Sequence, residues 1–197
     1  MSDVKLQSVD SDSDSASSFA VDISGFYQSE EKAYKTFRGL WRAGFNISNL
    51  GPRMKYEELG RKNFIPTNLK IGSAFDFIFD TSNKVSLNLE LNKLLVPSPS
   101  IPIKNSNGQI IGYNQSDVGF LSGIFKSFGD APNGFSEELE EITVSFGLEY
   151  LYNNSFAIRA GYFNENENKG ARKYFTFGTG FKIKEINLDL SYLLSTS

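Results

Sequence analysis

The stretch YFTFGTGFKIKEINLDLSYLL at residues 174–194 alternates between apolar and polar side chains, with one interruption at Lys184 and Glu185. A period of two places successive side chains on opposite faces of a β-strand. The interruption has the length of a tight turn, which makes the two flanking strands antiparallel. One face of the predicted hairpin is apolar and consists of Phe175, Phe177, Phe181, Ile183, Ile186, Leu188, Leu190, Tyr192 and Leu194.

Six further segments show the same alternation, so the chain is predicted to contain about eight strands. The segments are residues 19–28, 37–50, 66–79, 84–96, 141–151 and 155–163. Short turns at residues 80–83 and 153–154 alternate with longer connections at residues 51–65, 97–140 and 164–173. This pattern predicts an all-β, antiparallel up-and-down arrangement, with short turns at one end and long loops at the other.

Two regions do not follow the strand pattern. Residues 1–18 are rich in serine and aspartate, which predicts a polar loop or disordered lead before the β-rich body of residues 19–197. Residues 97–140 form a long insertion in that body. Within it, residues 116–130 are predicted to form a short amphipathic helix, with Ser116 as its N-cap and with Phe120, Ile124 and Phe128 on one face.

Alternation alone is typical of both a soluble β-sandwich and a transmembrane barrel, because both have one apolar and one polar face. Two observations favour the barrel. Most segments reach the roughly 9–11 residues that a spanning strand needs, and Tyr150, Tyr162 and Tyr192 lie near strand ends on the apolar face. We therefore predict an antiparallel up-and-down transmembrane β-barrel. Its lumen-facing charged residues are predicted to be Lys70, Asp76, Glu90, Glu149, Arg159, Lys182 and Asp189.

Composition argues against several classes of function. The 197 residues include no histidine and no cysteine, which removes the commonest general base, the thiolate nucleophile and the usual metal ligands. We therefore predict no enzyme activity, no cofactor and no metal. The net charge of −3 disfavours a nucleic-acid partner. The first residues lack the apolar core of a signal peptide, so we expect either a fragment whose export signal lies upstream or a protein that stays inside the cell.

Five stretches resemble a known family: FRGLWRAGFNISNLGPRMKY, NFIPTNLKIGSAFDF, KVSLNLELNKLLVP, EYLYNNSFAIRAGYFNE and GARKYFTFGTGFK. They are similar to the C-terminal part of the PorV family, outer-membrane barrels of the Bacteroidetes type IX secretion system within the FadL-like group. The resemblance implies the C-terminal portion of a fourteen-stranded barrel in the outer membrane of a Gram-negative cell. It also implies partners: the secretion translocon, the C-terminal signal domains of cargo, the surface attachment complex to which cargo is passed, and outer-membrane lipid.

The long-loop end holds the predicted partner-binding residues. Basic side chains lie in two of its loops, and they could bind a partner or lipid phosphates or be ordinary loop charges. They are Arg53, Lys55, Arg61, Lys62, Arg172 and Lys173. The row of Phe120, Ile124 and Phe128 either packs under its own loop or is an exposed anchor for the translocon.

Three alternatives remain open at this stage. A FadL-like channel for hydrophobic substrates predicts an apolar track in the lumen. A soluble β-sandwich binding module predicts a protein that needs no detergent. A lipopolysaccharide deacylase predicts that changing one serine or aspartate abolishes activity, but the absence of histidine leaves a serine nucleophile without its usual base.

Overall fold

A computed structural model of the chain describes residues 18–55, 62–97, 102–108, 110–113, 119–131 and 134–196. Most of these residues belong to one large antiparallel sheet. Its long strands are β1 (Val21–Gln28), β3 (Arg38–Leu50), β6 (Asn68–Ile78), β7 (Asn83–Leu94), β10 (Ile142–Tyr152), β11 (Phe156–Asn164), β12 (Lys173–Ile183) and β13 (Ile186–Ser195).

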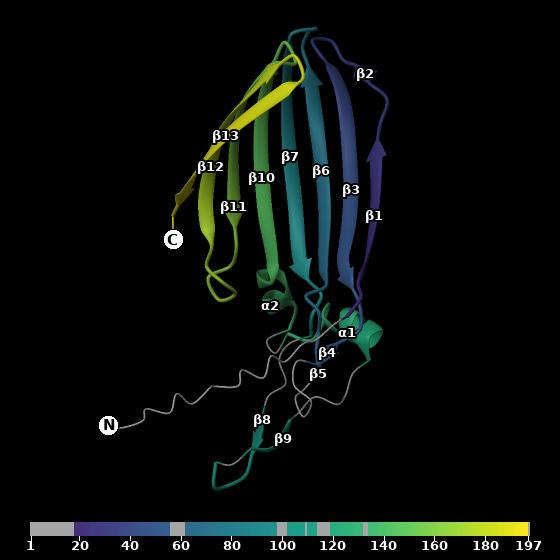
Figure 1. The fold of residues 1–197 in the computed structure, drawn as a ribbon, viewed down its shortest axis with the longest axis vertical. Helices are drawn as coiled ribbons and strands as arrows, with labels where there is room; N and C mark the ends of the chain where they lie inside the picture. The colour runs from purple at the N-terminus through teal and green to yellow at the C-terminus, as the bar shows by residue number, and fades with distance from the viewer. Residues whose placement is uncertain are drawn as a thin grey trace, which may run out of the picture.

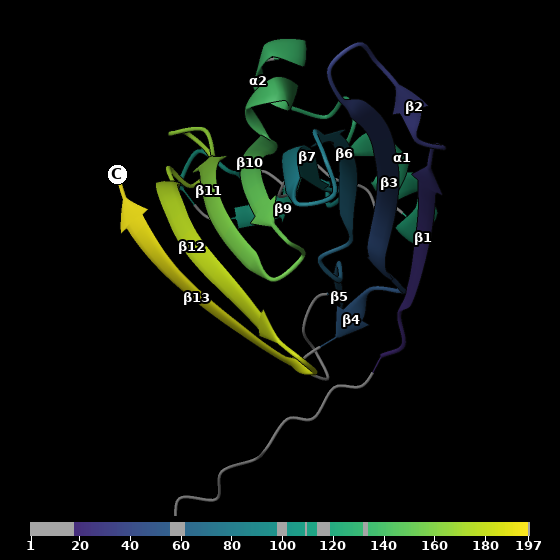
Figure 2. The same ribbon diagram turned by 90° about the horizontal axis from the view of Figure 1, so that it is seen from above.

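The long strands follow one another across the sheet in chain order, β1-β3-β6-β7-β10-β11-β12-β13. Every neighbouring pair is antiparallel. This confirms the predicted all-β, up-and-down fold (Figure 1). Seen from above, the strands form an arc that is open between β1 and β13 (Figure 2). The sheet is therefore barrel-like but not closed.

Asparagine, aspartate and lysine residues make the three tight turns at one end of the sheet. Asp80 accepts hydrogen bonds from the backbone amides of Ser82 and Asn83, at 2.7 and 2.8 Å. Asn153, Asn154 and Lys184 have φ values of 50°, 53° and 57°, the left-handed conformation that tight hairpins need. All other connections between the long strands, apart from the one between β1 and β3, lie at the opposite end, which we call the long-loop end (Figure 1).

Several small elements were not predicted from the sequence. β2 (Lys32–Ala33) pairs with β3, β4 (Met54–Lys55) with β5 (Lys62–Asn63), and β8 (Pro102–Lys104) with β9 (Ile110–Tyr113). The described part of the insertion contains two helices, α1 (Phe120–Lys126) and α2 (Phe135–Glu140), and only α1 was expected. Strands of two to four residues and a six-residue helix are too short for periodicity to reveal.

The predicted helix is corrected at both ends. α1 begins after Gly119, which makes no side-chain capping bond, and it ends before Phe128. Ser116, the predicted N-cap, lies outside the described residues. Glycines at positions 119 and 123 lower the helix propensity of this segment, which agrees with its shortness.

The register of the sheet shows which residues of neighbouring strands lie on the same face. On β6 the even-numbered residues share a face with even-numbered residues of β3 and β7, and with odd-numbered residues of β10 and β11. In the middle of the strands that face is mostly polar or small, and the opposite face is mostly apolar. We call them the polar face and the apolar face.

The apolar face is uncovered. Within the described residues, the only buried apolar side chains are those of Leu95, Ala131 and Ala157. Large side chains such as Phe45, Leu89 and Phe146 stay exposed. Burying one such side chain would stabilise the protein by roughly 1.5–3 kcal/mol relative to leaving it in water. A β-sandwich would pack a second sheet over this face, and the described residues provide no second sheet of comparable size. In the same part of the chain, no helix is long and apolar enough to cross a membrane.

Candidate partner-binding end and polar face

The polar face forms an open trough of about 720 Å³ across the middle strands. Its lining includes Arg42, Lys70, Glu90, Glu149 and Arg159. Glycines at positions 44, 72, 147 and 161 also line it, and they keep it wide. The trough therefore carries charged side chains of both signs on a lining that also includes apolar groups.

Ion pairs connect the strands along this face. Arg159 on β11 donates from Nε to Glu149 on β10 at 2.6 Å, and its Nη1 reaches Asp189 on β13. Glycine on β12 makes room for that reach, because a Cβ at Gly180 would lie 2.9 Å from the Arg159 guanidinium. These ion pairs are partly exposed. Such pairs contribute only about 0–1 kcal/mol to the free energy of folding, so their main effect is to order the side chains.

All seven residues predicted to face a lumen lie on the polar face. Asp76 pairs with Arg42 at 2.5 Å and with Lys84 at 4.0 Å, and Lys70 pairs with Glu90 at 3.6 Å. Lys182 forms no ion pair with any described residue. Arg42 was missed, although its even position on β3 is the signal that could have identified it.

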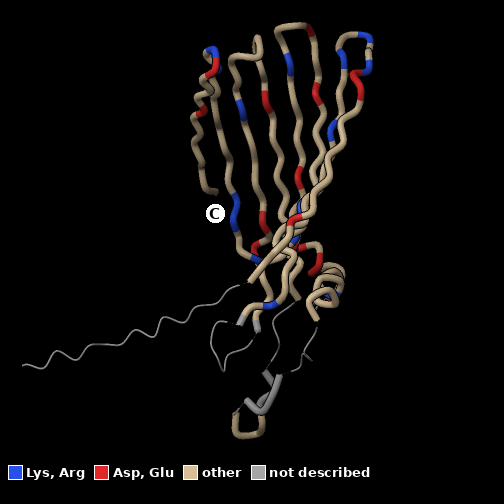
Figure 3. The backbone as a smooth tube through the Cα atoms, turned by 45° about the vertical axis from the view of Figure 1, so that its right-hand side comes forward, with Lys and Arg blue, Asp and Glu red and all other residues tan. Residues whose placement is uncertain are grey.

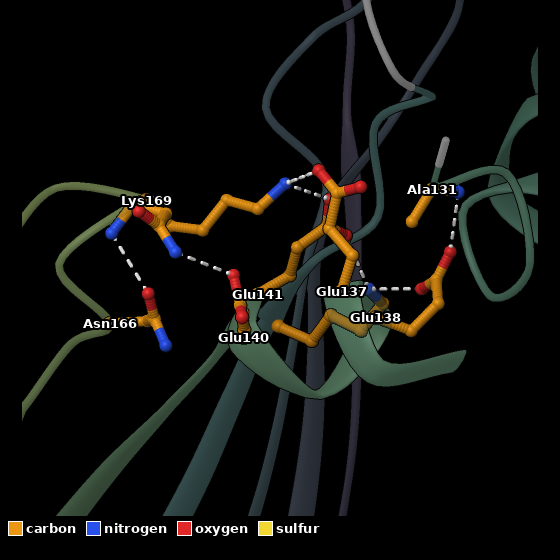
Figure 4. A network of polar contacts seen from close by, with 9 residues as sticks. Ala131, Glu137, Glu138, Glu140, Glu141, Asn166 and Lys169 are labelled. Carbon is orange, nitrogen blue, oxygen red and sulfur yellow. Dashed lines mark hydrogen bonds and ion pairs between the residues drawn. The ribbon is translucent and has the colours of Figure 1, made fainter. Parts of the chain in front are cut away.

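Charged residues lie along the backbone at the long-loop end (Figure 3). Ion pairs between some of them tie the insertion to the sheet. We call this group the α2 anchor: Lys93, Glu137, Glu138, Glu141 and Lys169. Lys93, near the end of β7, donates to Glu138 at 2.9 Å and to Glu141 at 2.7 Å. Lys169, in the connection from β11 to β12, donates to Glu137 at 2.7 Å and to Glu141 at 3.1 Å. Three parts of the chain thus meet at α2 (Figure 4).

The centre of the α2 anchor is buried. The side chains of Lys93 and Glu138 are each 8% exposed. The second oxygen of Glu138 accepts the Ala131 backbone amide at 2.9 Å. Burial alone would raise the pKa of Glu138, but the hydrogen bonds from Lys93 and Ala131 outweigh burial and hold that pKa below its usual value. Glu138 therefore stays ionised at neutral and mildly acidic pH, and the contribution of this pair to stability is lost only as the pH falls through that lowered pKa.

Two of the predicted basic residues, Arg172 and Lys173, pair with acids of the connection from β11 to β12. Arg172 binds Glu165 through two nitrogens, at 2.7 and 2.9 Å, and this bond lowers the pKa of Glu165. Lys173 donates to Glu167 at 2.6 Å. A carboxylate or phosphate of a partner would have to compete with these acids for both side chains.

The first long loop is described only in part. The Arg53 guanidinium lies 5.2 Å from the centre of the Phe64 ring. The backbones of Lys55 and Lys62 belong to the paired strands β4 and β5. Arg61 lies outside the described residues.

The helix α1 packs through one side. Gly123 is buried, and a Cβ there would lie 2.6 Å from the Phe64 ring and 3.1 Å from Pro97. Phe120 and Ile124 are half-buried, whereas Phe128 is exposed. The predicted row is thus split between packing and exposure.

An apolar set that shares only Phe128 with the predicted row is exposed at this end. Phe125 is 76% exposed and Phe135 is 77% exposed. The full set consists of Leu121, Phe125, Phe128, Phe135 and Leu139, from both helices and the turn after α1. Residues 121, 125 and 128 have helical spacing, as residues 120, 124 and 128 do, so periodicity could not decide which row packs against Phe64. We call the five residues the exposed apolar set.

Comparison with known proteins finds a family model that matches residues 1–101, more than half of the chain, and its description is "Type IX secretion system protein PorV". A search of curated proteins finds no match.

Proposed function

Because the chain belongs to the PorV family of type IX secretion system proteins, we propose that its long-loop end binds C-terminal signal domains of cargo. In this proposal the protein passes the bound signal domains to the attachment complex at the cell surface. The protein then acts as a binding component beside the secretion translocon and catalyses no reaction. The absence of histidine and cysteine from the 197 residues agrees with that role.

The exposed apolar set is the observation that supports this role. A handful of large apolar side chains in well-ordered positions supplies most of the energy in protein interfaces. Here they project from two short helices, one of which the α2 anchor ties to the sheet. Binding residues on loops that a rigid scaffold positions are typical of recognition sites.

Charged residues could complete the interface. The predicted basic residues Arg53, Lys55, Arg61, Lys62, Arg172 and Lys173 come from two loops at the same end of the sheet. Protein interfaces commonly have an apolar centre with a polar rim. In the proposal these residues belong to the rim, where they affect the rate of association and orientation more than affinity.

We further propose that the sheet lies in the outer membrane, with its apolar face against lipid. The uncovered side chains on that face support this placement, as does the strand length of 8–13 residues in the long strands. A spanning strand needs about 9–11 residues. Membership of a type IX secretion family is consistent with the same membrane.

Replacing Phe125 and Phe135 together with serine should lower the affinity for a cargo signal domain at least tenfold. Two exposed aromatic anchors are removed, and truncating one interface hot spot typically costs about 2 kcal/mol or more. The affinity is measured by biolayer interferometry with the purified chain in detergent and an immobilised signal domain.

The matched control is Phe26→Ser. Phe26 is an equally exposed phenylalanine at 73%, but it lies on β1, on the polar face, and is not part of the exposed apolar set. This variant should bind as the wild type does. Wild-type affinity in the double variant would show that the exposed apolar set takes no part in cargo binding.

A further inference from the structure

A pocket of about 400 Å³ lies on the apolar face at the short-turn end. Its lining includes residues of the connection from β1 to β3, which contains β2 (Figure 1). Lys32 on β2 pairs with Gly39 on β3, and this register brings Lys32 to the apolar side of the sheet. Tyr34, Trp41 and Phe75 line the pocket, and Glu30 and Lys32 belong to the same lining.

The aromatic walls of the pocket are held in place. Gly39 forms its buried floor, and a Cβ there would lie 2.5 Å from the Phe75 ring and 2.7 Å from the Tyr34 ring. Only glycine lets the two rings approach the strand this closely. The Trp41 indole donates to the Ser73 hydroxyl at 2.7 Å, which fixes its orientation. The pocket therefore needs little rearrangement to accept a ligand.

Two opposite charges in the lining of this pocket have no ion-pair partner among the described residues. Neither Glu30 nor Lys32 forms an ion pair with any residue that the structure describes, although both line the same pocket. Their neighbour Glu31 is paired with Arg38 at 2.7 Å. An ammonium group and a carboxylate that face the same space without meeting are complementary to a ligand that carries both charges.

We propose that this pocket binds a zwitterionic phospholipid with an ammonium headgroup, such as phosphatidylethanolamine. The phosphate lies against Lys32, the headgroup ammonium lies against Glu30, and the start of an acyl chain packs on the three rings. Aromatic side chains collect at headgroup level in membrane proteins. Short turns of outer-membrane barrels conventionally face the periplasm, where the leaflet consists of phospholipid. The inference rests on the membrane placement proposed above.

Trp41 allows a direct test, because it is the only tryptophan in the chain and lines the pocket. The full chain in detergent micelles is titrated with phosphatidylethanolamine that carries bromine on its acyl chains near the headgroup. We expect saturable quenching of tryptophan fluorescence, which unbrominated phosphatidylethanolamine reverses. Phosphatidylglycerol, which has the phosphate but no ammonium, should bind several-fold more weakly.

Two variants separate the two charges. Lys32→Gln should weaken phosphatidylethanolamine binding about fivefold, the usual effect of one basic residue near an anionic lipid group. Glu30→Gln should remove the preference for ethanolamine over glycerol headgroups while quenching persists. The control Lys184→Gln changes an exposed lysine in the tight turn between β12 and β13 and should leave both affinities unchanged.

Equal quenching by both lipids, unchanged in Lys32→Gln, would overturn the proposal, because the rings would then contact only bulk lipid. Competition by soluble phosphoethanolamine as strong as that by the lipid would also overturn it, since the site would then serve a soluble ligand. A chain that needs detergent and binds cargo signal domains, yet shows no headgroup preference, would refute this inference and leave the proposed function standing.

Discussion

Replacing Leu89 with arginine should prevent stable insertion of the sheet into lipid vesicles. Leu89 lies near the middle of β7 on the apolar face and is exposed. On the lipid side of a barrel, an arginine at the midplane costs about 2–4 kcal/mol. That is a large share of the total stability of a typical fold. The measurement is a urea titration of the protein folded into phospholipid vesicles.

Asn88→Arg is the matched control for this change. Asn88 is the adjacent residue, it lies on the polar face, and it lines the charged trough. The same side chain there meets water and acids such as Glu90, so we expect a change within about 0.5 kcal/mol, as for ordinary surface substitutions. Equal destabilisation by the two variants would contradict the assignment of the apolar face to lipid.

Replacing Lys93 with methionine should release α2 from the end of the sheet. The side chain of Glu138 is 8% exposed and would lose its ammonium partner. Breaking a buried ion pair by removing one partner typically costs about 3–5 kcal/mol. Backbone amides of α2 should then exchange with deuterium about a hundredfold faster or more, measured by hydrogen exchange and mass spectrometry.

Faster exchange in Lys93→Met could come from the lost ion pair itself or from the unpaired charge left buried on Glu138. The double variant Lys93→Met with Glu138→Gln distinguishes these two causes. It removes both charges, and Glu141 keeps its bond to Lys169 at 3.1 Å. Because no ionised carboxylate is left buried, exchange in the double variant should be much slower than in Lys93→Met. Wild-type exchange in the single variant would mean that the α2 anchor does not hold the helix.

The long strands could be predicted from the sequence because their period of two is continuous. β3 begins one residue later than predicted, at Arg38, and ends as predicted at Leu50. β7 begins at Asn83 and ends at Leu94, within two residues of the predicted range. Such strands have one uniform face, so each residue repeats the same signal.

α2 could not be predicted, for a physical reason. Its six residues FSEELE contain only two apolar side chains, and a helix this short is not stable alone. Contacts from distant residues hold it: Lys93 is 45 residues from Glu138, and Lys169 is 32 residues from Glu137. Lys93 also lies on the mainly apolar face of β7, and its partners are Glu138 in α2 and Glu141 directly after it.

The basic residues of the loops show a similar limit. From the sequence, Arg172 and Lys173 are two adjacent cations available to a partner. Their actual partners, Glu165 and Glu167, lie seven and six residues away across an irregular loop. Neither helical nor strand periodicity predicts a contact at that spacing.

The placement of the two faces can be measured directly, because the chain contains no cysteine that would interfere with labelling. Single cysteines at Leu87, Asn88, Leu89 and Glu90 are spin-labelled in lipid vesicles, and their accessibility to oxygen and to a water-soluble nickel chelate is compared. Oxygen concentrates in lipid, so we predict that it reaches positions 87 and 89 more readily than the chelate does, with the order reversed at positions 88 and 90. Preferential accessibility of positions 87 and 89 to the chelate would contradict the account, because the apolar face would then be in water.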